Sequence, residues 1–399
     1  MPLIIEGTLY FSSCTDNIIT ALGQSNHVCR IDLSLEDQQL EEVLAQMQVP
    51  FPELTELSLH PSSYYPYGEV PRAPPVIPDS FLAGSAPPLR ILRLYSISFP
   101  GLLKQIRFAT HLVELYLNDI PHSGYTSPQA MVAPLSVLSS LETLSFGFES
   151  PQSRPDLENP SLPPPKRSIL PALARFRFKG VTEYLEELVT RIDTPQLGEV
   201  LIIFFNQIDF ICPRLAQFIN RTPTLRAFDE ARVQFDDSIA SVILLSWTYG
   251  DISIDVSCRE PDWQLSSIEQ VCNTSLPSSS TVEDLYIEYR IPGLVWKGEA
   301  IENILWLGLL LPFTAVKNLF LSKDFSPGIA EALRELVGGR IAEVLPSLQN
   351  IFVEDLEQVS GSFQENIGQF VAARQLSNHP IVISNWEREK DSDSVVDVI

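Results

Sequence analysis

One short pattern, Leu-x-x-Leu-x-Leu, constrains the fold of this chain more than any other feature. It is clearest in THLVELYLN at 110–118, where Leu112, Leu115 and Leu117 occupy the three apolar positions. Side chains alternate between the two faces of a strand, so Leu115 and Leu117 point to one side and Tyr116 to the other. The pattern therefore predicts a short strand with one face against a core.

The same pattern returns about every 29 residues, which is within the period of leucine-rich repeats. Clear copies begin at Val28, Leu54, Leu89, Leu112, Leu141, Leu173, Leu197, Val282, Val316 and Leu348, looser copies at Leu225 and Tyr249, and a weak last copy is Ile381-x-Ile383. Several copies follow a proline, which can start a strand without removing a ladder hydrogen bond.

Amphipathic segments between the strands predict helices. The segment 182–192 places Tyr184, Leu185 and Leu188 on one face. Capping signals are Thr182, Ser266 with Glu269, and Ser362 with Glu365; further helices are expected at 35–47, 128–141, 213–220, 302–311 and 327–345. We predict an α/β leucine-rich-repeat solenoid, curved, with parallel strands on its concave face and helices on its convex face.

The composition of the segments suggests boundaries for this array. We assign 1–27 to an N-terminal capping segment, 28–386 to the repeats and 387–399 to a disordered acidic tail. Proline-rich insertions interrupt the period at 60–88 and 149–171. The tyrosines at 64, 65 and 67 in the first insertion are either a peptide-binding spot or part of a loop that folds back on the array.

The net charge bears on the partners of the chain, and the cysteine content bears on its location. With 27 Lys and Arg against 50 Asp and Glu, the net charge is -23, which disfavours nucleic acid and anionic membranes as partners. The five cysteines are widely spaced without a C-x-x-C pair, as expected for reduced thiols in a cytoplasmic or nuclear protein. The N-terminus lacks the pattern of a signal peptide, and the apolar run at 304–313 is too short to span a bilayer.

Motifs of enzymes and metal sites are missing from the sequence. We find no G-x-G-x-x-G, P-loop, G-x-S-x-G or H-E-x-x-H pattern. The five histidines are scattered, without Cys, Asp or another His at ligand spacing. We therefore expect no enzymatic activity, no cofactor and no metal.

The residues that point away from the core are the candidates for binding. The position between the second and third apolar residues of each copy gives Asp32, Ser58, Arg93, Tyr116, Ser145, Arg177, Leu201, Asp229, Ser253, Tyr286, Phe320, Phe352 and Val382. Neighbouring strands bring residues at one repeat position into a row. Arg175, Arg177 and Lys179 form a basic group on one strand, which is either a contact for an acidic partner or a solvated face.

The last four members of the row are apolar or aromatic. Tyr286, Phe320 and Phe352 would form an aromatic row extended by Val382, and Asp284, Glu288 and Glu354 would form an acidic rim that selects a basic partner. The alternative is that the tail after Ile383, including Trp386, covers the row. The segment VLIIFF at 200–205 is apolar on both faces, which favours burial under a loop over a ligand site.

Most of the chain resembles a large group of fungal F-box/leucine-rich-repeat proteins. The segments that carry this resemblance are HVCRIDLSL from His27, LAQMQVPFPELTELSL from Leu44, VIPDSFLAGSAPPLRILRL from Val76, THLVELYLNDIPHSGYTSPQAM from Thr110, FKGVTEYLEELVTRIDTPQL from Phe178 and CREPDWQLSSIEQVC from Cys258. In such proteins the F-box docks on the Skp1 subunit of a cullin-RING ubiquitin ligase, and the repeats hold the target.

The chain departs from this pattern at its start. An F-box is a helical segment before the repeats that usually opens with Leu-Pro, whereas here 16–23 is the one helix expected before Val28. We therefore expect the repeat region without an F-box, with Skp1 as a partner only if an F-box exists upstream. The resemblance implies the target-binding part of a ligase adaptor. The alternatives are a free-standing scaffold or sequestering protein, and an enzyme with a pocket between array and loops.

Overall fold

The computed structural model describes residues 1–8, 15–62, 73–84, 88–101, 106, 109–156, 166–248, 250–290 and 301–387. The chain divides into two compact units: unit 1 comprises Met1–Arg226 and Tyr249–Ile254, and unit 2 comprises Ala227–Thr248 and Asp255–Ile399. The tyrosines at 64, 65 and 67, the prolines at 163–165 and nearly all of the acidic tail lie outside the described residues.

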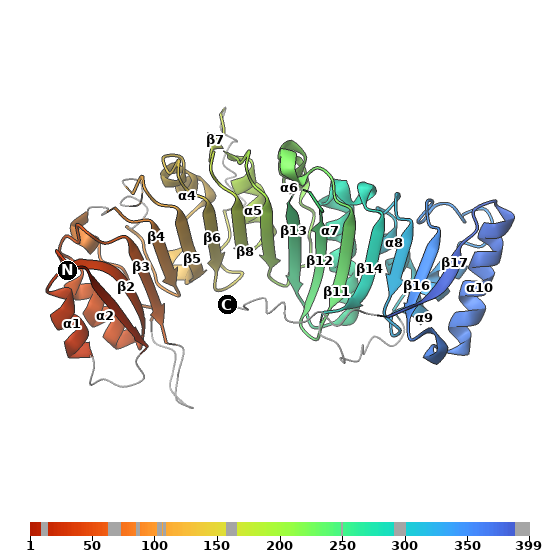
Figure 1. Cartoon of the computed structure of the whole chain (residues 1–399), viewed down its shortest axis with the longest axis horizontal. Coiled ribbons are helices and arrows are strands. Elements are labelled where there is room, and N and C mark those ends of the chain that lie inside the picture. Colours follow the sequence, from red (N-terminus) through yellow and green to blue (C-terminus); the bar gives the residue numbers. More distant parts are fainter. Residues whose placement is uncertain are drawn as a thin grey trace. The chain divides into compact units, whose positions relative to one another are not determined.

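Unit 1 is a sheet of parallel strands with helices packed on one side (Figure 1). Its strands pair in the order β1 (Leu3–Thr8), β2 (Val28–Leu35), β3 (Glu56–Pro61), β4 (Ile91–Tyr95), β5 (Glu114–Ile120), β6 (Thr143–Phe148), β8 (Arg175–Gly180) and β10 (Glu199–Phe204), followed by the first part of β13 (Asp251–Ser257). The helices are α1 (Thr15–Leu22), α2 (Asp37–Gln46), α4 (Pro128–Leu135), α5 (Thr182–Val189) and α6 (Pro213–Arg221). A separate pair is β7 (Ser168–Ile169) with β9 (Ile192–Asp193).

Unit 2 repeats this plan. Its strands pair in the order β12 (Ile239–Leu245), β11 (Glu230–Phe235), β14 (Asp284–Tyr289), β15 (Asn318–Leu321), β16 (Asn350–Glu354) and β17 (Val382–Trp386). The helices α7 (Pro261–Thr274), α8 (Asn303–Leu310), α9 (Ser326–Arg334) and α10 (Gly361–Leu376) pack one on the next. Short 3-10 helices in the two units are η2 (Phe81–Gly84), η3 (His122–Gly124), η4 (Pro223–Leu225), η5 (Pro277–Thr281) and η6 (Leu356–Gln358).

The apolar residues of the repeated pattern form the core. Leu112, Leu115 and Leu117 are all 0% exposed, and the residues between them are half-buried on the opposite side of the strand. Parallel strands, one for each copy of the pattern, need a crossover, and the helices supply it. The predicted α/β leucine-rich-repeat solenoid fold is therefore confirmed.

Four strands were not predicted: the short pair β7 and β9, and the strands β1 and β12. β1 pairs parallel with β2 within the segment that we expected only to cap the array. β12 runs antiparallel to β11 and interrupts the parallel arrangement. Neither β1 nor β12 carries the Leu-x-x-Leu-x-Leu spacing, because Gly7 and Thr8 end β1 and β12 returns directly from β11 without a crossover helix.

Several helix boundaries differ from the prediction. α7 begins at Pro261 after Glu260, well before Ser266, because proline suits the first helical position. α10 has Ser360 rather than Ser362 at its N-cap. α5 has Val181 at its N-cap, and the Gln207 side chain accepts from the Thr182 amide at 3.3 Å in place of a local cap.

Two predicted helices are too long. α4 ends at Leu135, and turns follow it up to 141. α9 ends at Arg334, shortly before Gly338, which has φ +118. A residue with this φ does not continue a right-handed helix.

Candidate protein-recognition faces

The side of each sheet opposite its helices, here called the strand face, carries the outward row. In unit 1 successive pairings place Asp32, Ser58, Arg93, Tyr116, Ser145, Arg177 and Leu201 side by side on seven neighbouring strands. The predicted order of the row is confirmed over this range. The strand face therefore presents one side chain per repeat at fixed spacing.

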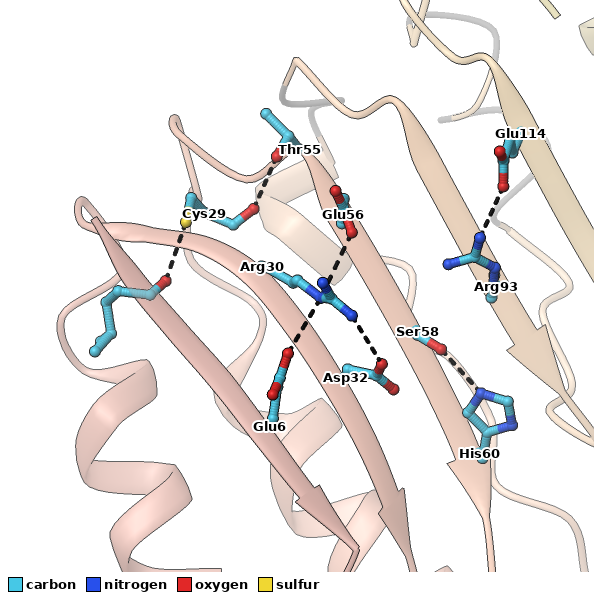
Figure 2. Close-up of polar contacts among 11 residues, drawn as sticks. Glu6, Cys29, Arg30, Asp32, Thr55, Glu56, Ser58, His60, Arg93 and Glu114 are labelled. Carbon is cyan, nitrogen blue, oxygen red and sulfur yellow. Dashed lines mark hydrogen bonds and ion pairs between the residues drawn. The ribbon is translucent and has the colours of Figure 1, made fainter. Parts of the chain in front are cut away.

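Charges on the strand face of unit 1 are matched locally (Figure 2). Arg30 lies among three carboxylates, 3.5 Å from Glu6, 3.4 Å from Asp32 and 3.5 Å from Glu56. Arg93 pairs with the Glu114 carboxylate at 2.7 Å. These groups are partly solvated, so their pairing contributes little to the stability of the fold and mainly determines how charge is distributed on the strand face.

Three residue types of a hydrolytic triad meet next to this cluster. His60 Nε2 lies 2.9 Å from Ser58 Oγ (Figure 2), and the charge of Asp32 acts on the imidazole. Ser58 is only 6% exposed, and the imidazole stacks on Tyr95 at 4.0 Å. Burial lowers the His60 pKa more than Asp32 raises it. A buried hydroxyl cannot reach a substrate carbonyl, so this contact packs the strand face.

The predicted basic group is in place, but its charges have partners within the chain. Arg177 pairs with Glu199 at 3.0 Å and Lys179 with Asp119 at 2.7 Å. Arg175 Nε donates to Thr143 Oγ1 at 2.9 Å. The repulsion that would call for an acidic partner is therefore offset inside unit 1. The hypothesis that Arg175, Arg177 and Lys179 bind an acidic segment stays a prediction.

The apolar strand of unit 1 differs from the expectation of burial. In β10 the outward residues Leu201 and Ile203 are half-buried, while Val200, Ile202 and Phe204 form the core. The loop cover predicted for this strand is thus incomplete among the described residues.

The strand face of unit 2 contains the aromatic row. Tyr286, Phe320 and Phe352 are paired in register on β14, β15 and β16. Their rings stack with centroid distances of 4.2 Å and 4.6 Å and interplanar angles of 6° and 10°. We call these three residues the aromatic stack. All three side chains remain half-buried rather than buried.

A row of amides runs beside the aromatic stack. Asn350 Nδ2 donates to Asn318 Oδ1 at 2.7 Å, and Asn318 Nδ2 donates to Asp284 Oδ1 at 2.6 Å. These side chains stand two residues before the stacked rings on the same strands. The hydrogen bonds tie three strands together along this face, which restricts the positions of the rings.

Two members of the predicted row were wrong. Arg232, not Asp229, stands beside Tyr286, because the pattern in this repeat begins at Phe228 and continues through Ala231 and Val233. Ser384, not Val382, stands beside Phe352, since Ile383 pairs with Ile351. A frame that begins three residues later, at Phe228, would have found Arg232, but Ala231 at a leucine position hides the pattern.

Arg232 is the main functional candidate that the sequence analysis missed. Its guanidinium lies 5.0 Å from the ring centroid of Tyr286. Glu230 and Glu288, 6% and 1% exposed, lie beside it at 2.5 Å and 3.8 Å. Burial, reinforced by these carboxylates, raises the pKa of Tyr286 to about 12, so the phenol stays neutral in the physiological range.

Trp386 contacts the aromatic stack, as the alternative account proposed. Its ring lies 5.8 Å from Tyr286 and 5.7 Å from Phe320, at 61° and 66° to them. Trp386 belongs to β17 and is itself half-buried. The chain thus covers part of the stack with one ring, while the residues from 388 onward lie outside the described part.

The described residues contain neither a candidate metal site nor a candidate membrane span. No group of three or more His, Cys, Asp or Glu side chains there could hold a metal ion. No helix in that part of the chain is both long enough and apolar enough to cross a membrane.

The chain was compared with known proteins and solved structures. The chain is similar to the crystal structure of the leucine-rich repeat-containing protein LegL7 from Legionella pneumophila, with 14% sequence identity, 95% of this chain and 91% of that chain covered, and a TM-score of 0.29. No protein-family model matches the chain. No curated protein matches it either. The fold assignment therefore rests on the repeat geometry, and the resemblance to F-box proteins stays a hypothesis.

Proposed function

We propose that this protein is a recognition module that binds another protein through the strand face of unit 2. The aromatic stack carries the proposal, because Tyr286, Phe320 and Phe352 lie in register with their rings half-buried on an outward face. Side chains that only fill space belong on the other side of these strands, where Leu285, Leu319 and Ile351 are 0% exposed.

The surroundings of the stack fit protein recognition better than catalysis. Aromatic residues and arginine are the common anchors of protein interfaces, and a polar rim normally surrounds them. Here the amides of Asn318 and Asn350 border the rings on one side, and Glu354 lies on the other. Glu288, predicted as part of the acidic rim, is buried at 1% exposed beside Arg232 instead. We propose no enzymatic activity, cofactor or metal for this face.

The finer proposal is that the module is the target-binding part of an F-box-type adaptor of a cullin-RING ubiquitin ligase, acting in the cytoplasm or nucleus. The resemblance of the sequence supports it. A free-standing scaffold that sequesters its partner is the second candidate, since the same aromatic stack would serve it equally well. Co-precipitation with purified Skp1 tests the adaptor, because stable binding by this chain would favour it over the free-standing scaffold.

The face itself is tested by replacing the three rings with threonine, which suits an exposed strand position. With Tyr286→Thr/Phe320→Thr/Phe352→Thr, the amount of each partner protein captured from cell extract should fall at least about tenfold. Aromatic anchors contribute most of an interface's binding energy. The measurement is quantitative mass spectrometry of the captured proteins, with circular dichroism to confirm folding.

Two comparison variants make this result specific. Val337→Ser changes a residue that is 45% exposed outside the strands and should leave the captured proteins unchanged. Arg175→Ser/Arg177→Ser/Lys179→Ser tests the strand face of unit 1, and loss of binding and of its salt dependence there would support the basic group. Equal capture by the threonine variant and the unaltered chain would refute the role of the aromatic stack.

A further inference from the structure

The aromatic stack has two ends, and they differ in what lies against the outer ring. At the Tyr286 end the guanidinium of Arg232 lies 5.0 Å from the ring centroid. Glu230 on the same strand holds this guanidinium, with Arg232 Nε 2.5 Å from Glu230 Oε1. At this end a cation thus lies on the outer ring of the stack and is held there by a carboxylate of the same chain.

The Phe352 end has no such closure among the described residues. Phe320 is the ring partner of Phe352 there, and no described cation lies over its ring. The neighbour in register on β17 is Ser384, whose side chain is too small to cover a phenyl face. Trp386 contacts the rings of Tyr286 and Phe320 instead. Within the described residues the outer face of Phe352 thus has no ring or cation recorded against it, and we call it the open end.

Carboxylates surround this open end. Glu354 lies two residues after Phe352 on the same face of β16, half-buried and without a described ion-pair partner. Burial and the nearby Glu354 raise the pKa of Asp324, against the opposing effect of Lys323. Lys323 also lies 3.6 Å from Asp355, so one lysine is shared between Asp324 and Asp355. The local charge favours a cation from outside the described structure.

We propose that the open end binds an arginine side chain of a basic partner segment, with the guanidinium stacked on Phe352 above Ser384 and paired with Glu354. The partner side chain would reproduce at this end what Arg232 does at the other. Arginine suits the site better than lysine, because its planar group stacks on a ring and pairs with a carboxylate at the same time. This inference rests on the proposed function and specifies the chemistry of the partner.

The test begins with a displayed library of random peptides, selected on the intact chain. The selected peptides should share an arginine. Replacement of this arginine by citrulline, which keeps the shape and removes the charge, should weaken binding by about tenfold, as measured by fluorescence anisotropy. The loss should shrink as salt is raised, since the pairing is electrostatic and partly solvated.

Variants of the chain locate the binding site. Ser384→Arg places a guanidinium beside Phe352 and should weaken the binding of the peptides by about tenfold or more. Glu354→Gln should weaken arginine peptides and leave their citrulline forms unchanged. Phe352→Leu keeps an apolar strand residue but removes the ring face, so it should act like Ser384→Arg. Leu376→Arg, at a residue that is 89% exposed on α10, adds the same charge elsewhere and should have no effect.

The outcomes separate this inference from the proposed function. The selected peptides could need Tyr286, Phe320 and Phe352 for binding, yet bind equally well with citrulline in place of arginine and to the Ser384→Arg variant. This result would overturn the arginine site and leave protein recognition standing. A selection that yields no peptide dependent on the rings would overturn both. Arginine peptides that bind equally to Ser384→Arg and Leu376→Arg would place the site elsewhere and also overturn the inference.

Discussion

Leu115→Ala should lower the free energy of unfolding of unit 1 by about 2–5 kcal/mol, because the truncation leaves a cavity in a core that cannot fully collapse. Leu115 is 0% exposed and stands between Leu92 on β4 and Leu144 on β6, which are 2% and 0% exposed. Both neighbours keep their backbone pairing in the variant, so the side chains cannot move together to fill the gap. Urea unfolding followed by far-ultraviolet circular dichroism measures the loss.

Leu201→Ala is the matched control for this prediction. It removes the same atoms from a strand of the same unit, but Leu201 is a half-buried residue of the strand face. We expect a clearly smaller loss, because a solvated side chain gains less from folding. Equal losses in the two variants would show that the repeated pattern does not mark the core.

Tryptophan fluorescence adds a second reading to the same experiment. All five tryptophans of the chain lie in the sequence range of unit 2, so their emission reports that unit alone. The sequence predicts one cooperative array, in which Leu115→Ala shifts the tryptophan transition together with the circular dichroism transition. A tryptophan transition that stays in place would show that the two units unfold independently.

The strand positions could be predicted because each repeat uses the same apolar spacing, as Leu112, Leu115 and Leu117 illustrate. A fixed period brings equivalent residues into register, so the stacking of Tyr286 on Phe320 was foreseeable from their positions alone. The prediction failed where a small residue interrupts the spacing. Ala231 fills a leucine position in β11, and this shifted the assigned outward residue from Arg232 to Asp229.

Electrostatic partners were harder to predict than positions. Arg177 and Glu199 are not aligned in register, since Glu199 pairs with Arg175. Their ion pair depends on side chains that lean along the strands, which the alternation of faces does not specify. The same holds for Trp386, whose ring reaches Tyr286 although β17 and β14 are not neighbouring strands. The sequence therefore could not predict whether the side chains of a strand face have partners within the chain, and the structure was needed to show it.

Arg374→Leu should destabilise unit 2 by about 3–5 kcal/mol, since buried carbonyl groups would lose their charged donor. Arg374 lies near the end of α10 and is 1% exposed, a rare environment for arginine. Its guanidinium donates to four backbone carbonyls, those of Ile341 at 3.3 Å, Leu345 at 3.4 Å, Pro346 at 3.0 Å and Leu348 at 3.3 Å. Burial lowers its pKa, as expected for a cation that pairs with no carboxylate among the described residues.

These four carbonyls belong to the segment that leads into β16, the strand that carries Phe352. Leucine in place of Arg374 fills part of the volume but offers no donor, so the carbonyls would be left buried and unsatisfied. Arg374→Lys keeps the charge and fewer donors and should recover part of the loss. Arg340→Leu is the control, because the Arg340 side chain is 60% exposed and its pair with Glu343 contributes at most about 1 kcal/mol. The tryptophan-monitored unfolding midpoint measures all three variants, and an Arg374→Leu midpoint no lower than that of Arg340→Leu would show that the buried guanidinium does not hold this segment.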